Sequence, residues 1–92
     1  MEIKGTIIYV GELQTFGSFQ KREFWIKEDK EKYPQTFKVE CVQDKVTLLD
    51  SVGNNENVTA HVNLRGRHYD KNGKEGVINS IQCWKLDKEV PF

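Results

Sequence analysis

Apolar and polar residues alternate along most of this chain, and the alternation predicts extended strands. In the first such segment, residues 3–13, Ile3, Ile7 and Tyr9 share one face at a spacing of two, while Ile8 lies on the opposite face. A strand that is apolar on both faces fits a strongly curved sheet that serves two neighbouring layers. Residues 3–13 are therefore predicted to form a coiled first strand.

Four further segments have the period of two that is typical of strands. They are residues 21–28, 36–42, 57–69 and 75–86. In residues 57–69 the alternation predicts one inward face, made of Val58, Ala60, Val62 and Leu64. Asn72-Gly73 joins the last two segments and predicts a tight hairpin turn, and Gly17-Ser18 marks a turn before the second strand.

The spacing changes in residues 44–53, where apolar residues lie three and four positions apart. Val46 and Leu49 are three apart, Asp44 is a suitable N-cap, and Gly53 is a suitable C-terminal stop. This segment predicts one short helix of about two turns. The order of elements is therefore β-β-β-α-β-β.

This order predicts an all-β domain, a five-stranded OB-fold barrel whose one short helix lies between strands 3 and 4. The domain is expected to span residues 1–86, and residues 87–92 are expected to form a short acidic and hydrophobic tail. OB-fold barrels bind oligonucleotides on the face built around strands 2 and 3, between the strand 1–2 and strand 4–5 loops. Residues that bind a nucleic acid are therefore expected on that face and in those loops.

The formal net charge of the 92 residues is zero, which argues against a polycation that coats nucleic acid by charge alone. The basic residues are nevertheless clustered locally. Between residues 65 and 74 stand four of them (Arg65, Arg67, Lys71 and Lys74) and a single acidic residue, Asp70. An anion site is therefore expected to be a patch at the predicted hairpin.

Neither a membrane protein nor a secreted protein is expected. No apolar run approaches the roughly 18 residues that cross a bilayer, and the first residues do not resemble a signal peptide. Cys41 and Cys83 lack the spacing of a metal or redox motif and are read as reduced, buried thiols. These features predict a cytoplasmic protein.

Binding of single strands requires cations along a groove and flat aromatic side chains on which bases stack. Trp25 stands between lysines on the outward face of its strand, although a tryptophan there would also close a barrel end. Trp84 would either extend the stacking surface or pack against the helix. The hairpin cations would either contact phosphate or only keep a sheet edge soluble. The predicted nucleic-acid-binding residues are Lys21, Arg22, Trp25, Lys27, Lys38, Arg65, Arg67, His68, Tyr69, Lys71, Lys74 and Trp84.

Motifs of catalytic chemistry are absent from the sequence. It contains no zinc-protease, phosphate-loop or serine-hydrolase motif, and His61 and His68 lack neighbours at the spacing of a metal site. We therefore expect no enzyme, no metal and no cofactor.

The chain ends in acidic residues followed by a hydrophobic residue, proline and phenylalanine, from Asp87 to Phe92. This ending resembles the C-terminal tip of bacterial single-stranded DNA-binding proteins, which docks replication and repair enzymes. The resemblance implies that Val90, Pro91 and Phe92 anchor a partner while Asp87 and Glu89 steer it. In that family a long linker precedes the tip and the acidic run is denser, whereas here Lys88 dilutes the charge.

The body of the chain resembles a family of small OB-like proteins from Bacteroidetes and their phages. The shared pattern runs through KREFWIKE, YPQTFKVE, DKVTLL, VNLRGRHY and INSIQCWKL. The two resemblances imply a homo-oligomer, a dimer or larger, that binds single-stranded DNA in replication, repair and recombination, in a bacterial cell or a phage-infected host. Two other functions stay open: a protein-interaction adaptor without nucleic-acid binding, and a binder of single-stranded RNA.

Overall fold

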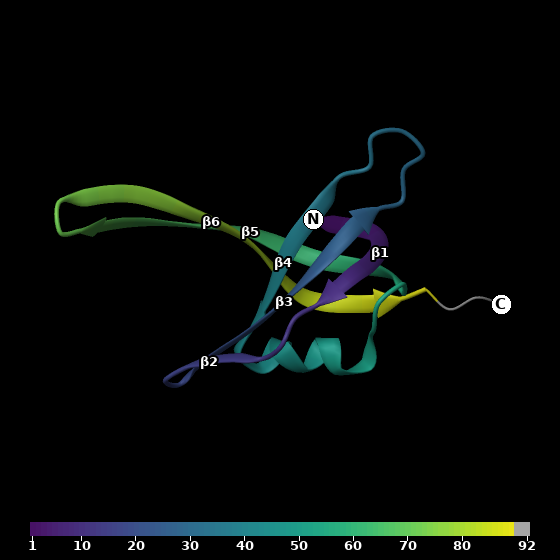
Figure 1. Cartoon of the computed structure of the whole chain (residues 1–92), viewed down its shortest axis with the longest axis horizontal. Helices are drawn as coiled ribbons and strands as arrows, with labels where there is room; N and C mark the ends of the chain where they lie inside the picture. The colour runs from purple at the N-terminus through teal and green to yellow at the C-terminus, as the bar shows by residue number, and fades with distance from the viewer. Residues whose placement is uncertain (90–92) are drawn as a thin grey trace.

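Six strands and one short helix make up the part of the chain that the structure, a computed structural model, describes, which is residues 1–89 (Figure 1). The elements are β1 (Glu2–Val10), β2 (Gln14–Phe16), β3 (Phe19–Glu28), β4 (Thr36–Val42), the 3₁₀ helix η1 (Gln43–Ser51), β5 (Asn57–Lys71) and β6 (Lys74–Lys88). The predicted strands and the predicted helix are all present. β6 continues through Lys88, two residues past the expected end of the domain at residue 86.

Five of the strands close into a barrel. They pair in the order β1-β5-β6-β4-β3, and β1 also pairs with β3, so the ring returns to its first strand. All pairs are antiparallel except β4 with β6, which meet in parallel at Glu40 and Gln82. The helix η1 follows β4, which is the third barrel strand in chain order, as predicted. The chain therefore has the all-β OB-fold that the order of elements predicted.

The sixth strand, β2, replaces part of the segment predicted as a turn. It pairs with the start of β3, from Gln14 opposite Lys21 to Phe16 opposite Phe19. Gly17 has a positive φ of 62° and occupies the turn between the two strands. The turn signal at Gly17-Ser18 was therefore correct, but the strands on both sides of it reach the turn itself.

The helix begins earlier than the sequence predicts. It starts at Gln43 and follows Val42 in an extended conformation, without a side-chain hydrogen bond at the cap. The prediction that Asp44 is the N-cap was therefore wrong, and Asp44 lies in the first turn. The apolar residues of the helix, Val46 and Leu49, are buried as predicted, and Leu49 packs in the main core.

The core fills the barrel with side chains from all five strands of the ring. Its largest fully buried members are Phe24, Ile7 and Ile26, together with Leu49 from η1. Cys41 and Cys83 also lie in this core as free thiols. The hydrogen bond to Cys83 and burial both raise the pKa of the Cys41 thiol. The prediction of reduced, buried cysteines is confirmed.

Tyr9 and Leu64 are exposed, although the alternation groups each of them with residues that the core buries. Tyr9 points outward because the pairing of β1 with β3 shifts register between Ile7 and Tyr9, which changes the face that follows. Leu64 is 67% exposed. It pairs with Ile81, beyond the part of β5 that pairs with β1. β5 and β6 extend from the barrel as a long hairpin (Figure 1), so the alternation of β5 continues past the core.

Candidate nucleic-acid interface

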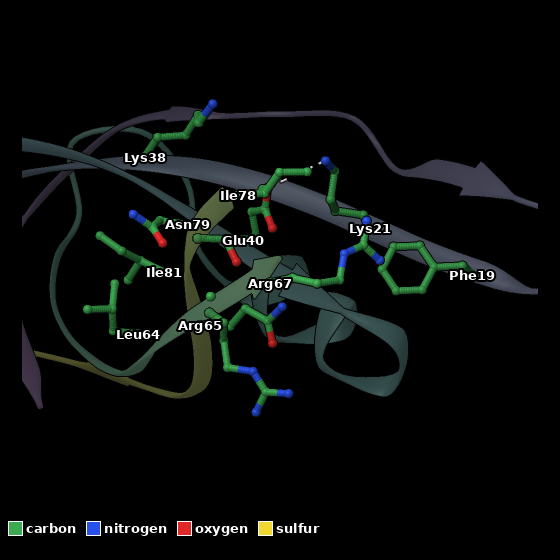
Figure 2. A pocket seen from close by; sticks show the side chains of 13 residues that line it. Phe19, Lys21, Lys38, Glu40, Leu64, Arg65, Arg67, Ile78, Asn79 and Ile81 are labelled. Atoms are coloured by element: carbon green, nitrogen blue, oxygen red, sulfur yellow. Dashed lines mark hydrogen bonds and ion pairs between the residues drawn. The ribbon is translucent and has the colours of Figure 1, made fainter. Parts of the chain in front are cut away.

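A groove of about 900 Å³ lies between the outer face of β3 and β4 and the base of the β5–β6 hairpin (Figure 2). Its cations come from both walls: Lys21 and Lys38 from the barrel, and Arg65 and Arg67 from the hairpin. We call this space the hairpin groove. Four of the predicted nucleic-acid-binding residues, distant in sequence, are thus brought together.

The hairpin separates its charges onto two faces. Successive residues of a strand point to opposite faces, and cross-strand partners share a face. We call one side the cationic face; on it Arg65, Arg67, Tyr69 and Lys71 pair with Ser80, Ile78, Gly76 and Lys74. We call the other side the acidic face; on it Leu64, Gly66, His68 and Asp70 pair with Ile81, Asn79, Val77 and Glu75.

All four hairpin cations therefore share one face, and both hairpin acids share the other. Arg65 and Arg67 make no ion pair with any of residues 1–89, so both guanidinium groups are open to an anion. In contrast, Nε2 of His68 lies 2.7 Å from Oε1 of Glu75 on the acidic face. His68, predicted as a binding residue, thus lies away from the cationic face.

The barrel wall of the hairpin groove is less positive. Lys21 Nζ lies 3.4 Å from Glu40 Oε1, and both side chains are partly buried. Glu23 stands directly opposite Glu40 on the neighbouring strand. The barrel wall is therefore close to neutral, and the hairpin wall carries the excess positive charge. The arginines therefore supply most of the positive charge that the groove offers to an anion.

An aromatic pair lies next to the groove on the same outer face of the barrel. Trp25 stands opposite Tyr9 on β1 and opposite Lys38 on β4. The ring centroids of Tyr9 and Trp25 are 4.3 Å apart and the ring planes are tilted by 32°. Trp25 is 39% exposed, so it does not close a barrel end. Its outward face and its position beside a lysine are those of a stacking platform.

Sequence reasoning missed two aromatic residues at this surface. The alternation placed Tyr9 on one face with Ile3 and Ile7, because an unbroken period of two does not reveal the bulge. Phe19 lines the hairpin groove but stood within a predicted turn. One available signal was the aromatic residue on each side of Gly17-Ser18, Phe16 and Phe19, since paired aromatics next to a turn are typical of a hairpin.

Arg22 has a structural role in the fold. Its Nε donates a hydrogen bond to the carbonyl oxygen of Gly11 at 2.8 Å, and its Nη1 lies 3.0 Å from Asp50 Oδ1. The side chain thus joins the end of β1 to η1. It does not line the hairpin groove, in contrast to the four cations that do. Lys27 is on the outer face of β3 with Trp25, two positions further along the strand.

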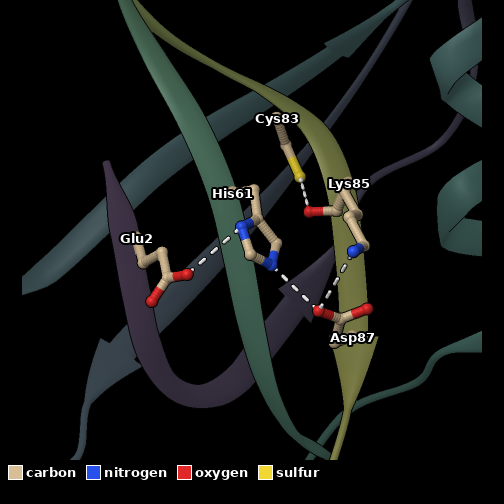
Figure 3. A network of polar contacts seen from close by, with 5 residues as sticks. All are labelled: Glu2, His61, Cys83, Lys85 and Asp87. Carbon is tan, nitrogen blue, oxygen red and sulfur yellow. Dashed lines mark hydrogen bonds and ion pairs between the residues drawn. The ribbon is translucent and has the colours of Figure 1, made fainter.

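Trp84 lies over a different part of the barrel. It occupies the register shift between β5 and β6, and its ring centroid is 5.4 Å from that of His61. His61 in turn contacts Glu2 at 3.4 Å and Asp87 at 2.9 Å (Figure 3). Trp84 does not line the hairpin groove, and it is not among the hydrophobic side chains that pack against the core, of which Leu49 from η1 is a member.

Part of the predicted tail contacts the barrel. Asp87 pairs with Thr59 in the sheet, and its carboxylate contacts His61 and, at 4.0 Å, Lys85 (Figure 3). The backbone nitrogen of Glu89 donates to Asn57 at 2.9 Å. The anchoring residues Val90, Pro91 and Phe92 lie outside the described residues.

The tip of the β5–β6 hairpin is a tight turn flanked by two lysines. Asn72 and Gly73 have positive φ angles of 55° and 76°, which confirms the predicted tight turn. Lys71 and Lys74 flank this turn as cross-strand partners. The ring of Tyr69 covers Gly76, where a Cβ atom would come within 2.7 Å of Tyr69 Cζ. Tyr69 is thereby fixed on the cationic face.

Within residues 1–89, no three of the His, Cys, Asp and Glu side chains gather as metal ligands would. The described part of the chain also holds no helix with the length and apolarity that crossing a bilayer requires.

Residues 2–87 match a family described as a domain of unknown function. No curated protein matches the sequence. Several solved structures resemble the whole fold. The mitochondrial single-stranded DNA-binding protein Rim1 of S. cerevisiae superposes with a TM-score of 0.74 at 13% identity, covering 96% of this chain and 91% of that one.

Two bacterial structures resemble the chain to a similar degree. The second single-stranded DNA-binding protein of Mycobacterium smegmatis gives a TM-score of 0.69 at 15% identity, covering 97% of this chain and 86% of that one. The small single-stranded DNA-binding protein of Streptomyces coelicolor gives 0.70 at 11% identity, covering 98% and 93%. At these identities the likeness shows a shared fold.

Proposed function

This chain belongs to the DUF3127 family, and we propose that it is a single-stranded DNA-binding protein that holds its ligand in the hairpin groove. The observation that carries this proposal is the groove itself, in which Arg65 and Arg67, without an ion pair among residues 1–89, face an outer barrel surface that presents exposed aromatic rings. The proteins that share its fold are named for single-stranded DNA binding, which supports the same function.

In this proposal the hairpin contacts the phosphates and the barrel surface contacts the bases. Arg65 and Arg67 on the hairpin contact the phosphates, with Lys71 and Lys74 extending the positive track toward the tip. Trp25 and Tyr9 offer ring faces to the bases, with Lys38 beside them. Phosphates and ring faces are present in every nucleotide, so binding is largely independent of sequence. Lys21 offsets Glu40 on the barrel wall, and Lys27 adds positive charge beyond Trp25 on the outer face of β3.

The titration of labelled oligo-dT and oligo-U at two salt concentrations tests this function. Oligo-dT is expected to bind at low salt and to lose affinity steeply as salt rises, because each phosphate contact releases counterions. Emission from Trp25 should change on binding. Absence of oligo-dT binding at low salt contradicts the proposal and favours an adaptor, a reading that the zero net charge supports. Tighter binding of oligo-U would assign the groove to RNA.

We further propose that the end of the chain recruits replication, repair or recombination enzymes. The acidic and hydrophobic ending supports this, because a terminal phenylalanine offers an apolar ring and a carboxylate on one residue. Asp87 Oδ2 lies 2.9 Å from His61 Nε2. We therefore propose Glu89, the acidic residue nearest the anchor, as the residue that steers the partner. The resemblance to bacterial and phage proteins supports a cytoplasmic homo-oligomer.

Deletion of residues 90–92 tests the recruitment. The truncated chain is expected to keep its oligo-dT affinity and its thermal stability, because the barrel ends with β6 at Lys88. Pulldown from an extract of the source cell should recover partners with the full chain and lose them with the truncated one. An Asp87→Asn variant serves as the control, with partner capture unchanged. Equal capture by the full and truncated chains contradicts the role of the tail.

A further inference from the structure

The tip of the β2–β3 hairpin carries an exposed aromatic pair that the core does not explain. Phe16 is 61% exposed and Phe19 is 39% exposed, and the two are cross-strand partners beside the turn at Gly17. Neither ring belongs to the core or packs against it. Leaving two phenylalanines in water forfeits their burial energy, so a ligand that covers them has a direct energetic reason to bind.

The position of the pair connects it to the hairpin groove. Phe19 is on the same outer face of β3 as Lys21 and Trp25, since it stands two and six residues from them on one strand. Phe19 and Arg67 line the groove from opposite walls. In Figure 2 the side chain of Arg67 extends toward the Phe19 ring, with Lys21 beside it.

We infer that Phe16 and Phe19 form, with Arg67, a second base-stacking site at the far end of the groove from Tyr9 and Trp25. This inference rests on the proposed function. A nucleobase is the occupant because its flat face fits between an aromatic ring and a planar guanidinium. The phosphate beside that base meets Arg65 and Lys21. An apolar peptide would bring no negative charge to the two unpaired arginines.

The two stacking sites are separated along the groove. Six residues of extended strand from Phe19 to Trp25 span about 20 Å. A strand of several nucleotides is therefore needed to occupy both sites at once, within the range of about 4 to 16 nucleotides for one OB-fold. The affinity of the wild type should rise with oligonucleotide length until the strand reaches both sites.

The test is a Phe16→Ala, Phe19→Ala double variant titrated with oligo-dT of increasing length. It is expected to lose about tenfold to a hundredfold in affinity for long strands, and to stop gaining affinity at a shorter length than the wild type. The salt slope should stay unchanged, because stacking releases no counterions. A Tyr33→Ala variant removes a 91% exposed aromatic outside the groove and should bind like the wild type.

The outcomes separate this site from the proposed function. If the wild type binds and the double variant matches it at every length, the second site is wrong while the function stands. If the wild type fails to bind, both are wrong. A Phe16→Trp variant, with the native hairpin intact, should show quenching beyond that of the wild type on adding oligo-dT; unchanged emission would also overturn the site. Altered self-association of the DNA-free double variant, with unchanged affinity, would assign the pair to a second copy instead.

Discussion

A Gly5→Ala variant is expected to lose about 3 kcal/mol or more of unfolding free energy. A Cβ atom at Gly5 would overlap the carbonyl oxygen of Lys27 and come within 2.8 Å of its carbonyl carbon. The obstacle is backbone, so β1 and β3 must move apart. Gly5 pairs with Glu28 on one side and Val58 on the other, which is where β1 closes the ring. Overpacking usually costs about 1–3 kcal/mol, and a rigid neighbour places this site at or above the upper end.

Urea titration and thermal melting followed by circular dichroism measure this loss. For a domain of this size, about 3 kcal/mol corresponds to a fall in melting temperature of about 12–24 °C. Gly53→Ala is the matched control, because a Cβ atom there meets nothing within 4 Å and φ is not in the positive range. Its stability should stay within about 1 kcal/mol of the wild type. Equal stability of the two variants would show that the barrel closes without the close approach at Gly5.

Sequence patterns were sufficient to predict the barrel, but not the face on which every strand residue lies. Strand period, the Asn72-Gly73 turn and the position of one helix predicted the fold, because each depends on local spacing. The same patterns could not reveal the bulge after Ile7, since one extra residue in a strand leaves the apolar composition unchanged. Tyr9 was therefore predicted to share the face of Ile3 and Ile7, although it forms a pair with Trp25 on the surface.

The candidate site was predictable only where alternation held. Arg65 and Arg67 were predicted on an outward face, and the hairpin places both on the cationic face. Whether a charge is available depends on partners that the chain brings from far away. Arg22 contacts Asp50, 28 positions along the chain, and Asp87 contacts His61, 26 positions away. Local patterns contain no information about such pairings, so the sequence alone did not separate structural charges from those free to bind.

The division of the hairpin into two charged faces leads to the largest expected effect on binding. An Arg65→Gln, Arg67→Gln double variant should lose at least about a hundredfold in affinity for oligo-dT. Each lost charged hydrogen bond removes about 1.5–3 kcal/mol, and every 1.4 kcal/mol is tenfold. The logarithmic salt slope should become shallower by about 1.4, since each single-strand phosphate contact contributes about 0.7.

The matched control alters the same amount of charge on the opposite face. An Asp70→Asn, Glu75→Gln variant raises the net charge by two, as the arginine variant lowers it by two. If net charge governed binding, the two variants would shift affinity in opposite directions by similar amounts. Asp70 and Glu75 do not line the hairpin groove. Because the Debye length is about 8 Å at physiological salt, charges outside the groove are screened from the strand. The acidic-face variant should therefore bind within about twofold of the wild type at that salt. A large gain in its affinity would mean that the strand contacts both faces, and that the groove is only part of the binding surface.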